Sequence, residues 1–309
     1  MSAGWVAGGV RARAIARRRL GRDGARQAAS CSSLEQALGV LAATAYRGPA
    51  QDGQGGGLAA VQHGVAATVL WDLRVLAGWL PRGGLRLLRP LAGWFEIANI
   101  DELLEGMAGR PAGDQFELGA LATDWPRLRR SASPAELRSG LAASAWKDPG
   151  GDSGLAVRVG VRARWAERVA ALGGPAQTWA AGAMAVLVAA ERFAAARPLN
   201  PVVRAVARNL LGAPAAEAAT FAELRDQLPA RLAWALEPAR SPADLWRAEA
   251  AWWDRVEREG FQLLRSSALD WHPVLGAAAL LAADARRVRA ALELAARGGG
   301  PLEAYDALA

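Results

Sequence analysis

Two stretches 100 residues apart decide the fold, namely SLEQALGVLAATAYRGP at Ser33–Pro49 and SPAELRSGLAASAWKDP at Ser133–Pro149. At this constant offset they match at the following pairs: Leu41 and Leu141, Thr44 and Ser144, Tyr46 and Trp146, Arg47 and Lys147, Pro49 and Pro149. A third and shorter copy, TFAELRDQL, occupies Thr220–Leu228 and repeats the PAELRSGL of the second. Self-similarity along a chain is the mark of a protein built from repeated units. The sequence therefore predicts internal repetition.

Each copy opens with a signal for the start of a helix. Ser33, Ser133 and Thr220 are each followed, three residues later, by Gln or Glu. This spacing is typical of a capping box, in which two side chains satisfy two free backbone amides at a helix N-terminus. Ser241-Pro-Ala-Asp244 offers a fourth example. Apolar residues then recur at helical spacing, so we expect a buried face on each helix.

A second type of segment is an amphipathic helix that ends in glycine, a common C-terminal signal. Four segments have this form: Val10–Gly21, Ile97–Gly109, Val202–Gly212 and Leu281–Gly298. Only three isoleucines and five threonines occur in the 309 residues, a scarcity of β-branched residues that argues against a large sheet. The one plausible strand, Leu155–Val161, could equally begin a helix. The predicted fold class is all-α.

The copies and the breaks between them predict three pseudo-repeated helical units, over residues 1–94, 95–200 and 201–309. Gly48–Gly57 and Pro149–Gly154 are rich in glycine and are expected to be linkers. Pro198 and Pro201 are expected to break a helix before the third unit.

The net charge of +7 has two explanations. A polyanionic partner such as nucleic acid would attract the arginines of Val10–Arg22 and Arg127–Arg130. A GC-rich genome would also favour arginine over lysine, and Lys147 is the only lysine beside 36 arginines. The interspersed acidic residues favour the second explanation, and nucleic acid is therefore an alternative partner only.

No motif for catalysis, for a cofactor or for a metal is found in the sequence. Lys147 precedes Asp148, so the Lys-Ser/Thr pair of a phosphate-binding loop is missing. His63 and His272 have no partners at metal-ligand spacing. Carboxylates cluster at Asp101–Glu105, where a solvated helix face is the common explanation. We expect a protein that is not an enzyme.

Tryptophan is abundant, and most of it is expected in the core because its neighbours are apolar. Six residues form this group: Trp71, Trp79, Trp94, Trp165, Trp179 and Trp234. The adjacent pair Trp252 and Trp253 must point about 100° apart on a helix, so at least one is expected near an edge or a partner.

The sequence predicts no membrane-spanning segment, because its most apolar runs, Trp179–Ala190 and Val274–Ala283, are too short. Cys31 is the single cysteine, which fits a cytoplasmic location without disulfides.

Three segments of the chain, with its closing helix, resemble the C/d subunit family of vacuolar- and archaeal-type rotary ATPases. VRARAIARRRL at Val10–Leu20 is similar to the family's opening helix, and Leu34–Pro49 to its Leu-x-x-Thr-x-Tyr-Gly segment. FEIANIDELL at Phe95–Leu104 is similar to a helix in which the family commonly has Lys at the position of Asp101 and Arg at that of Glu105. The closing Leu280–Arg297 also fits the family's last helix.

This resemblance implies a funnel of three helical units with pseudo-threefold arrangement. It implies a non-catalytic central-stalk subunit, whose partners are the central shaft subunits and the membrane proteolipid ring. Such a subunit transmits torque for proton or sodium transport and lies at the membrane only through the complex. The resemblance assigns no docking residues, and the role of the Gly48–Gly57 segment stays open.

Overall fold

A computed structural model describes residues 3–302, 305 and 306, without the side chains of residues 50–56. Helices make up most of this part of the chain, and no strand occurs in it, which confirms the all-α fold class. Leu155–Val161 lies in helix α8 (Gly154–Ala170), so of the two predictions for this segment the helix is correct.

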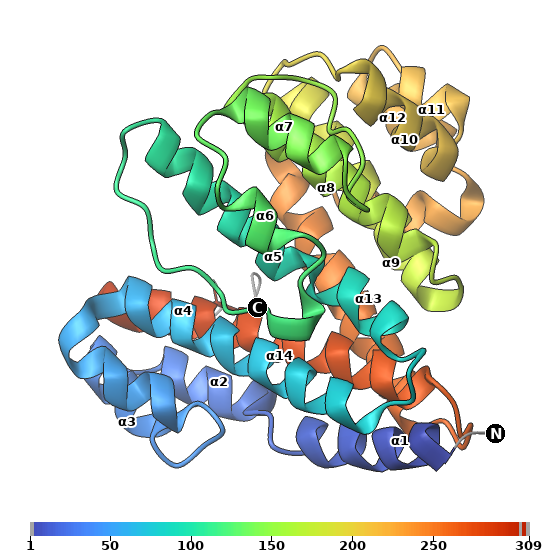
Figure 1. Ribbon diagram of the computed structural model, residues 1–309. Helices are drawn as coiled ribbons and strands as arrows, with labels where there is room; N and C mark the ends of the chain where they lie inside the picture. Colours follow the sequence, from blue (N-terminus) through green and yellow to red (C-terminus); the bar gives the residue numbers. More distant parts are fainter. Residues whose placement is uncertain (1–2, 303–304, 307–309) are drawn as a thin grey trace. The chain divides into compact units, whose positions relative to one another are not determined.

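The chain divides into two compact units, one of residues 1–88 and 253–309 and the other of residues 89–252. In the first unit α14 packs against α1, α2, α3 and α4 (Figure 1). The helices of this unit are α1 (Ala3–Ala16), α2 (Gly21–Ala29), α3 (Leu34–Leu41), α4 (Arg47–Trp79) and α14 (His272–Ala296). Two helices, α5 (Leu85–Met107) and α13 (Leu245–Arg265), cross the boundaries between the units.

In the second unit, α8 packs against α9 and α10, and α10 packs against α11 (Figure 1). Besides α8, its helices are α6 (Trp125–Leu128), α7 (Pro134–Ala142), α9 (Gly174–Ala189), α10 (Pro201–Leu211), α11 (Ala213–Glu217) and α12 (Phe221–Gln227). Shorter turns are the 3₁₀ helices η1 (Gly119–Leu121), η3 (Ala230–Ala235) and η4 (Pro242–Asp244), and the π-helix η2 (Ala190–Ala194). The predicted third unit, residues 201–309, is divided between the two units. The three-unit arrangement therefore stays a prediction.

The predicted helix starts are present. The hydroxyl oxygens of Ser33, Ser133 and Thr220 accept the backbone N–H three residues later, at 3.3, 3.2 and 3.1 Å. At Thr220 the capping box is complete, because the side chain of Glu223 in turn accepts the backbone N–H of Thr220. In the first two copies the corresponding side chain instead accepts the backbone N–H of the residue before the cap. Gln36 accepts from Ser32, and Glu136 accepts from Ala132. The same residues therefore begin α3, α7 and α12, as the sequence predicts.

The predicted linkers differ in outcome. Pro149–Gly154 contains the loop before α8, and α10 begins at Pro201, as expected. Gly48–Gly57 is not a loop, because its backbone belongs to α4. Gly57, at φ 70°, interrupts the helix there, in a conformation that residues with a Cβ rarely adopt. The prediction of a linker over Gly48–Gly57 was therefore wrong, because within this segment only Gly57 departs from helical backbone geometry.

A buried carboxylate organises the first unit. Asp284 on α14 is 1% exposed, and it accepts the backbone N–H groups of Leu20 and Gly21 at 2.9 and 2.7 Å. It also accepts the hydroxyl of Tyr46, at 2.8 Å. Burial, together with the charge of Asp284, raises the pKa of Tyr46 well above its usual value. One side chain therefore joins α14 to the start of α2 and to the turn after α3.

The second unit repeats this arrangement with other residues. Glu96 on α5 is fully buried and accepts the backbone N–H groups of Thr123 and Asp124 at 2.6 and 2.9 Å. The indole N–H of Trp146 donates to the same carboxylate at 2.8 Å. Tyr46 and Trp146, which match at the offset of 100 residues, thus donate to equivalent groups.

Replacing the central carboxylate tests its importance for stability. We expect Asp284→Asn to lower the free energy of unfolding by about 2–3 kcal/mol, because an amide cannot accept all three donors. Asp72→Asn is the matched control. Asp72 is also buried, but its ion pair with Arg18 does not offset the effect of burial, and its pKa is raised. This control should change stability by less than about 1 kcal/mol. Equal losses in urea unfolding would show that Asp284 has no special role.

Candidate interaction surface

Three of the tryptophans expected in the core are instead at the surface. Trp71 and Trp79 on α4 are 59% and 51% exposed, and Trp94 on α5 is 48% exposed. Of the other three, Trp179 is buried as predicted, whereas Trp165 and Trp234 are half-buried. The prediction from apolar neighbours was therefore wrong for half of this group, because a helix can be rich in alanine and leucine and still present a tryptophan to solvent.

The adjacent pair on α13 is half-buried at both positions. The indole N–H of Trp252 donates to the backbone oxygen of Trp179 at 2.8 Å. The guanidinium of Arg286 lies 5.6 Å from the ring of Trp253. Both rings therefore have partners within the chain.

The exposed apolar side chains of α1 and α4, namely Val6, Val10, Trp71 and Trp79, are called the α1–α4 surface below. The two helices pack together, and Arg11 of α1 lies 5.9 Å from the ring of Trp79. Gly4 allows a close approach, since a Cβ there would be 3.0 Å from the nitrogen of Pro81. Tryptophan with adjacent arginine is the composition that protein–protein interfaces favour. This surface is the candidate site for a protein partner.

The arginines near the N-terminus are largely engaged within the first unit. Arg18 is ion-paired with Asp72 at 2.8 Å, and Arg13 donates to the backbone oxygens of Leu264 and Ser266. The ring of Phe261 lies 4.6 Å from the guanidinium of Arg19. These contacts reduce the number of arginines available to a phosphate backbone.

Arg22 belongs to a partly buried charged cluster. It donates to Glu257 at 2.7 Å, and the buried Arg287 donates to the same carboxylate, also at 2.7 Å. Burial by itself would raise the pKa of Glu257, but the hydrogen bonds from Arg287 and Arg22 outweigh it, and the pKa is lowered. The ionised form is therefore the one that the fold stabilises.

Two carboxylates of α5, those of Asp101 and Glu105, are ion-paired with arginines of α8. Asp101 accepts from Arg162 at 2.6 Å, and Glu105 pairs with both Arg158 and Arg110. Glu102 accepts the backbone N–H of Gly113. The hydrogen bonds from Arg110 and Arg158 lower the pKa of Glu105 to about 2. Asp101 and Glu105, where the resembled family commonly has Lys and Arg, thus have basic partners on the neighbouring helix.

His272 and Cys31 are of residue types that often bind metals, and each has a hydrogen-bonding partner within the fold. His272 begins α14, with its ring 4.1 Å from that of Trp271 and its Nδ1 2.6 Å from a carboxylate oxygen of Asp270. Cys31 is a free thiol whose sulfur lies 3.6 Å from the backbone oxygen of Gln27. Within the described residues, no group of three or more His, Cys, Asp or Glu could hold a metal ion.

None of the helices in residues 3–302 is both long and apolar enough to cross a membrane. Searches of known protein families and of curated proteins find no match to this sequence.

Surface variants can show whether the exposed tryptophans contribute to the fold. We expect Trp71→Ser to lower the free energy of unfolding by less than about 1 kcal/mol, because most of the side chain is in water. Trp146→Ala, at a fully buried site, should cost about 3–5 kcal/mol. Urea unfolding measures both, and a loss at Trp71 as large as that at Trp146 would contradict an interaction role for this residue.

The pH dependence of stability tests the Glu257 cluster. Because the pKa of Glu257 is lowered by folding, its contribution is present above its ordinary value of 4.5 and is lost as the pH falls through the folded value. Glu257→Gln should therefore be markedly less stable than the wild type at pH 7. The difference should shrink as the pH falls below the ordinary value of 4.5, because the carboxyl group of the unfolded chain then takes up a proton first. A difference that is constant with pH would exclude this ion-pair explanation.

Proposed function

We propose that the chain is a non-catalytic central-stalk subunit of a V/A-type rotary ATPase, which connects the rotor shaft to the membrane proteolipid ring. The repeated segment carries the proposal. The copy at Leu34–Pro49 contains the motif that resembles the C/d family, and both this copy and Ser133–Pro149 contain an aromatic residue that donates to a buried carboxylate. A subunit that transmits torque needs stiff elements fixed to one another, and buried charged hydrogen bonds supply that stiffness.

The proposal includes three helical units in a funnel with pseudo-threefold arrangement, and torque transmission for proton or sodium transport. Its partners are the central shaft subunits and the proteolipid ring, and the chain would lie at the membrane peripherally through the complex. The α1–α4 surface is the place that we assign to one of these protein partners. Two observations support this assignment: the exposure of Trp71 and Trp79 and the presence of arginine beside Trp79.

The alternative is an Arg-rich helical protein that binds nucleic acid. The engagement of Arg13, Arg18 and Arg22 by acceptors within the fold favours the connector instead. A titration with duplex DNA separates the two functions. A nucleic-acid-binding protein should lose affinity steeply, about 10³-fold or more, between about 50 and 200 mM salt.

Recovery of partners from the native host tests the proposed function. A tagged chain should co-purify with shaft subunits and with the proteolipid ring in mild detergent, identified by mass spectrometry. The double variant Trp71→Ser/Trp79→Ser should recover less of one partner, whereas Trp246→Ser, at an exposed tryptophan of the second unit, should recover as much as the wild type. Recovery of neither partner by the wild type would refute the proposal.

A further inference from the structure

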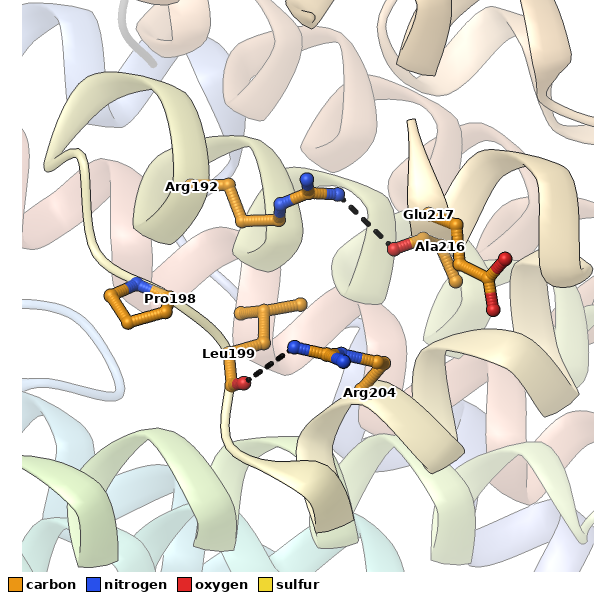
Figure 2. Close-up of a pocket in the computed structure, with 6 residues that line it drawn as sticks. All are labelled: Arg192, Pro198, Leu199, Arg204, Ala216 and Glu217. Atoms are coloured by element: carbon orange, nitrogen blue, oxygen red, sulfur yellow. Dashed lines mark hydrogen bonds between the residues drawn. The ribbon is translucent and has the colours of Figure 1, made fainter. Parts of the chain in front are cut away.

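A pocket of about 370 Å³ lies in the second unit, between η2, α10 and α11 (Figure 2). Its lining consists of Arg192, Pro198, Leu199, Arg204, Ala216 and Glu217. In Figure 2 the side chain of Arg192 lies on one side of this hollow and that of Arg204 on the other. The volume is within the range of small-molecule sites, which begins at about 300 Å³.

The two arginines are held in place by neutral groups rather than by carboxylates. Arg192 donates through Nη1 to the backbone oxygen of Ala216 at 3.1 Å, and its guanidinium lies 5.1 Å from the ring of Phe193. Arg204 donates through Nη2 to the backbone oxygen of Leu199 at 3.5 Å. Among the described residues, neither has a carboxylate oxygen within ion-pairing distance. Each guanidinium has five N–H donors, so positive charge and free donors remain at this pocket.

The backbone beside the pocket is unusual in two places. Arg192 belongs to the π-helix Ala190–Ala194. The π-helix is a rare form of backbone, and where it occurs it is often found at a functional site. Ala196, two residues after the end of the π-helix, has φ 51°, in the left-handed region that a residue with a Cβ seldom occupies. Such backbone costs free energy and persists where a particular placement of side chains requires it.

We propose that this pocket binds the phosphate group of a small molecule. Guanidinium groups bind phosphate through paired, charge-assisted hydrogen bonds, and two of them at one hollow supply both the charge and the donors. Pro198, Leu199 and Ala216 form an apolar wall for the rest of the molecule. The phosphate group belongs either to a soluble metabolite or to a lipid headgroup, and the chemistry at the arginines is the same.

Glu217 limits the charge that the pocket accepts. Glu217 is one of the lining residues, and its carboxylate is ion-paired with the exposed Arg208 at 3.3 Å. A ligand with a second anionic group on this side would be repelled, whereas a hydroxyl group could donate to the carboxylate. The residue therefore favours a single phosphate with a hydroxyl-bearing body. This site is independent of the proposed central-stalk function.

Titration of the full chain at constant ionic strength tests the proposal, with NMR chemical shifts as the readout. The probes are sodium phosphate, glycerol 3-phosphate and phosphatidylcholine vesicles that contain phosphatidic acid, with sodium chloride as the reference. Arg192→Gln and Arg204→Gln should each weaken phosphate binding about tenfold or more. Glu217→Gln should tighten it, because the variant removes the repulsive charge. Arg204 is exposed, so its variant keeps the test decisive if Arg192→Gln fails to fold.

Arg240→Gln is the matched control, because it removes one positive charge from the exposed surface of the same unit without touching the lining. It should bind phosphate as the wild type does. Binding of the soluble probes identifies a metabolite as the source of the phosphate, and binding of the vesicles alone identifies a lipid. The proposal is overturned if no probe binds the wild type, or if Arg240→Gln weakens binding as much as Arg192→Gln.

Discussion

The buried carboxylate that receives two consecutive backbone amides and one aromatic donor is the interaction on which each unit depends. Removing a carboxylate from water costs several kcal/mol, and only a full set of donors offsets that cost. Asp284 and Glu96 each have three such donors. Because the donors come from segments far apart in the sequence, the satisfied carboxylate fixes the position of a long helix, the start of a short helix and the turn after a third.

The two carboxylates also explain why the aromatic position tolerates a change of residue type. The hydroxyl of Tyr46 and the indole N–H of Trp146 differ in shape, but each carries one donor at the end of a large apolar ring. In both copies the residue two positions earlier has a hydroxyl that bonds the backbone, through Thr44 and Ser144. What the copies share is therefore a pattern of donors and acceptors, and this pattern can be kept while the sequence changes.

The sequence predicted the local parts of this structure and missed the long-range ones. Ser33, Ser133 and Thr220 act within one turn of a helix, so their roles follow from spacing alone. Asp284 looks like an ordinary polar residue off the apolar stripe of its helix, and nothing nearby in the sequence reveals partners 238 to 264 residues away. Apolar composition, likewise, could not say which side of α4 faces solvent at Trp71 and Trp79. The pocket at Arg192 was missed because its lining comes from three separate elements.

The first unit is made of two segments, and its central helix α14 lies near the end of the chain. During synthesis, the amides of Leu20 and Gly21 and the hydroxyl of Tyr46 emerge from the ribosome long before Asp284 has been made. The second unit, by contrast, is one continuous stretch, and Glu96 precedes all its donors. Residues 89–252 can therefore fold while the chain is being translated, whereas the helices of the first unit that precede them have to wait until α14 has been made.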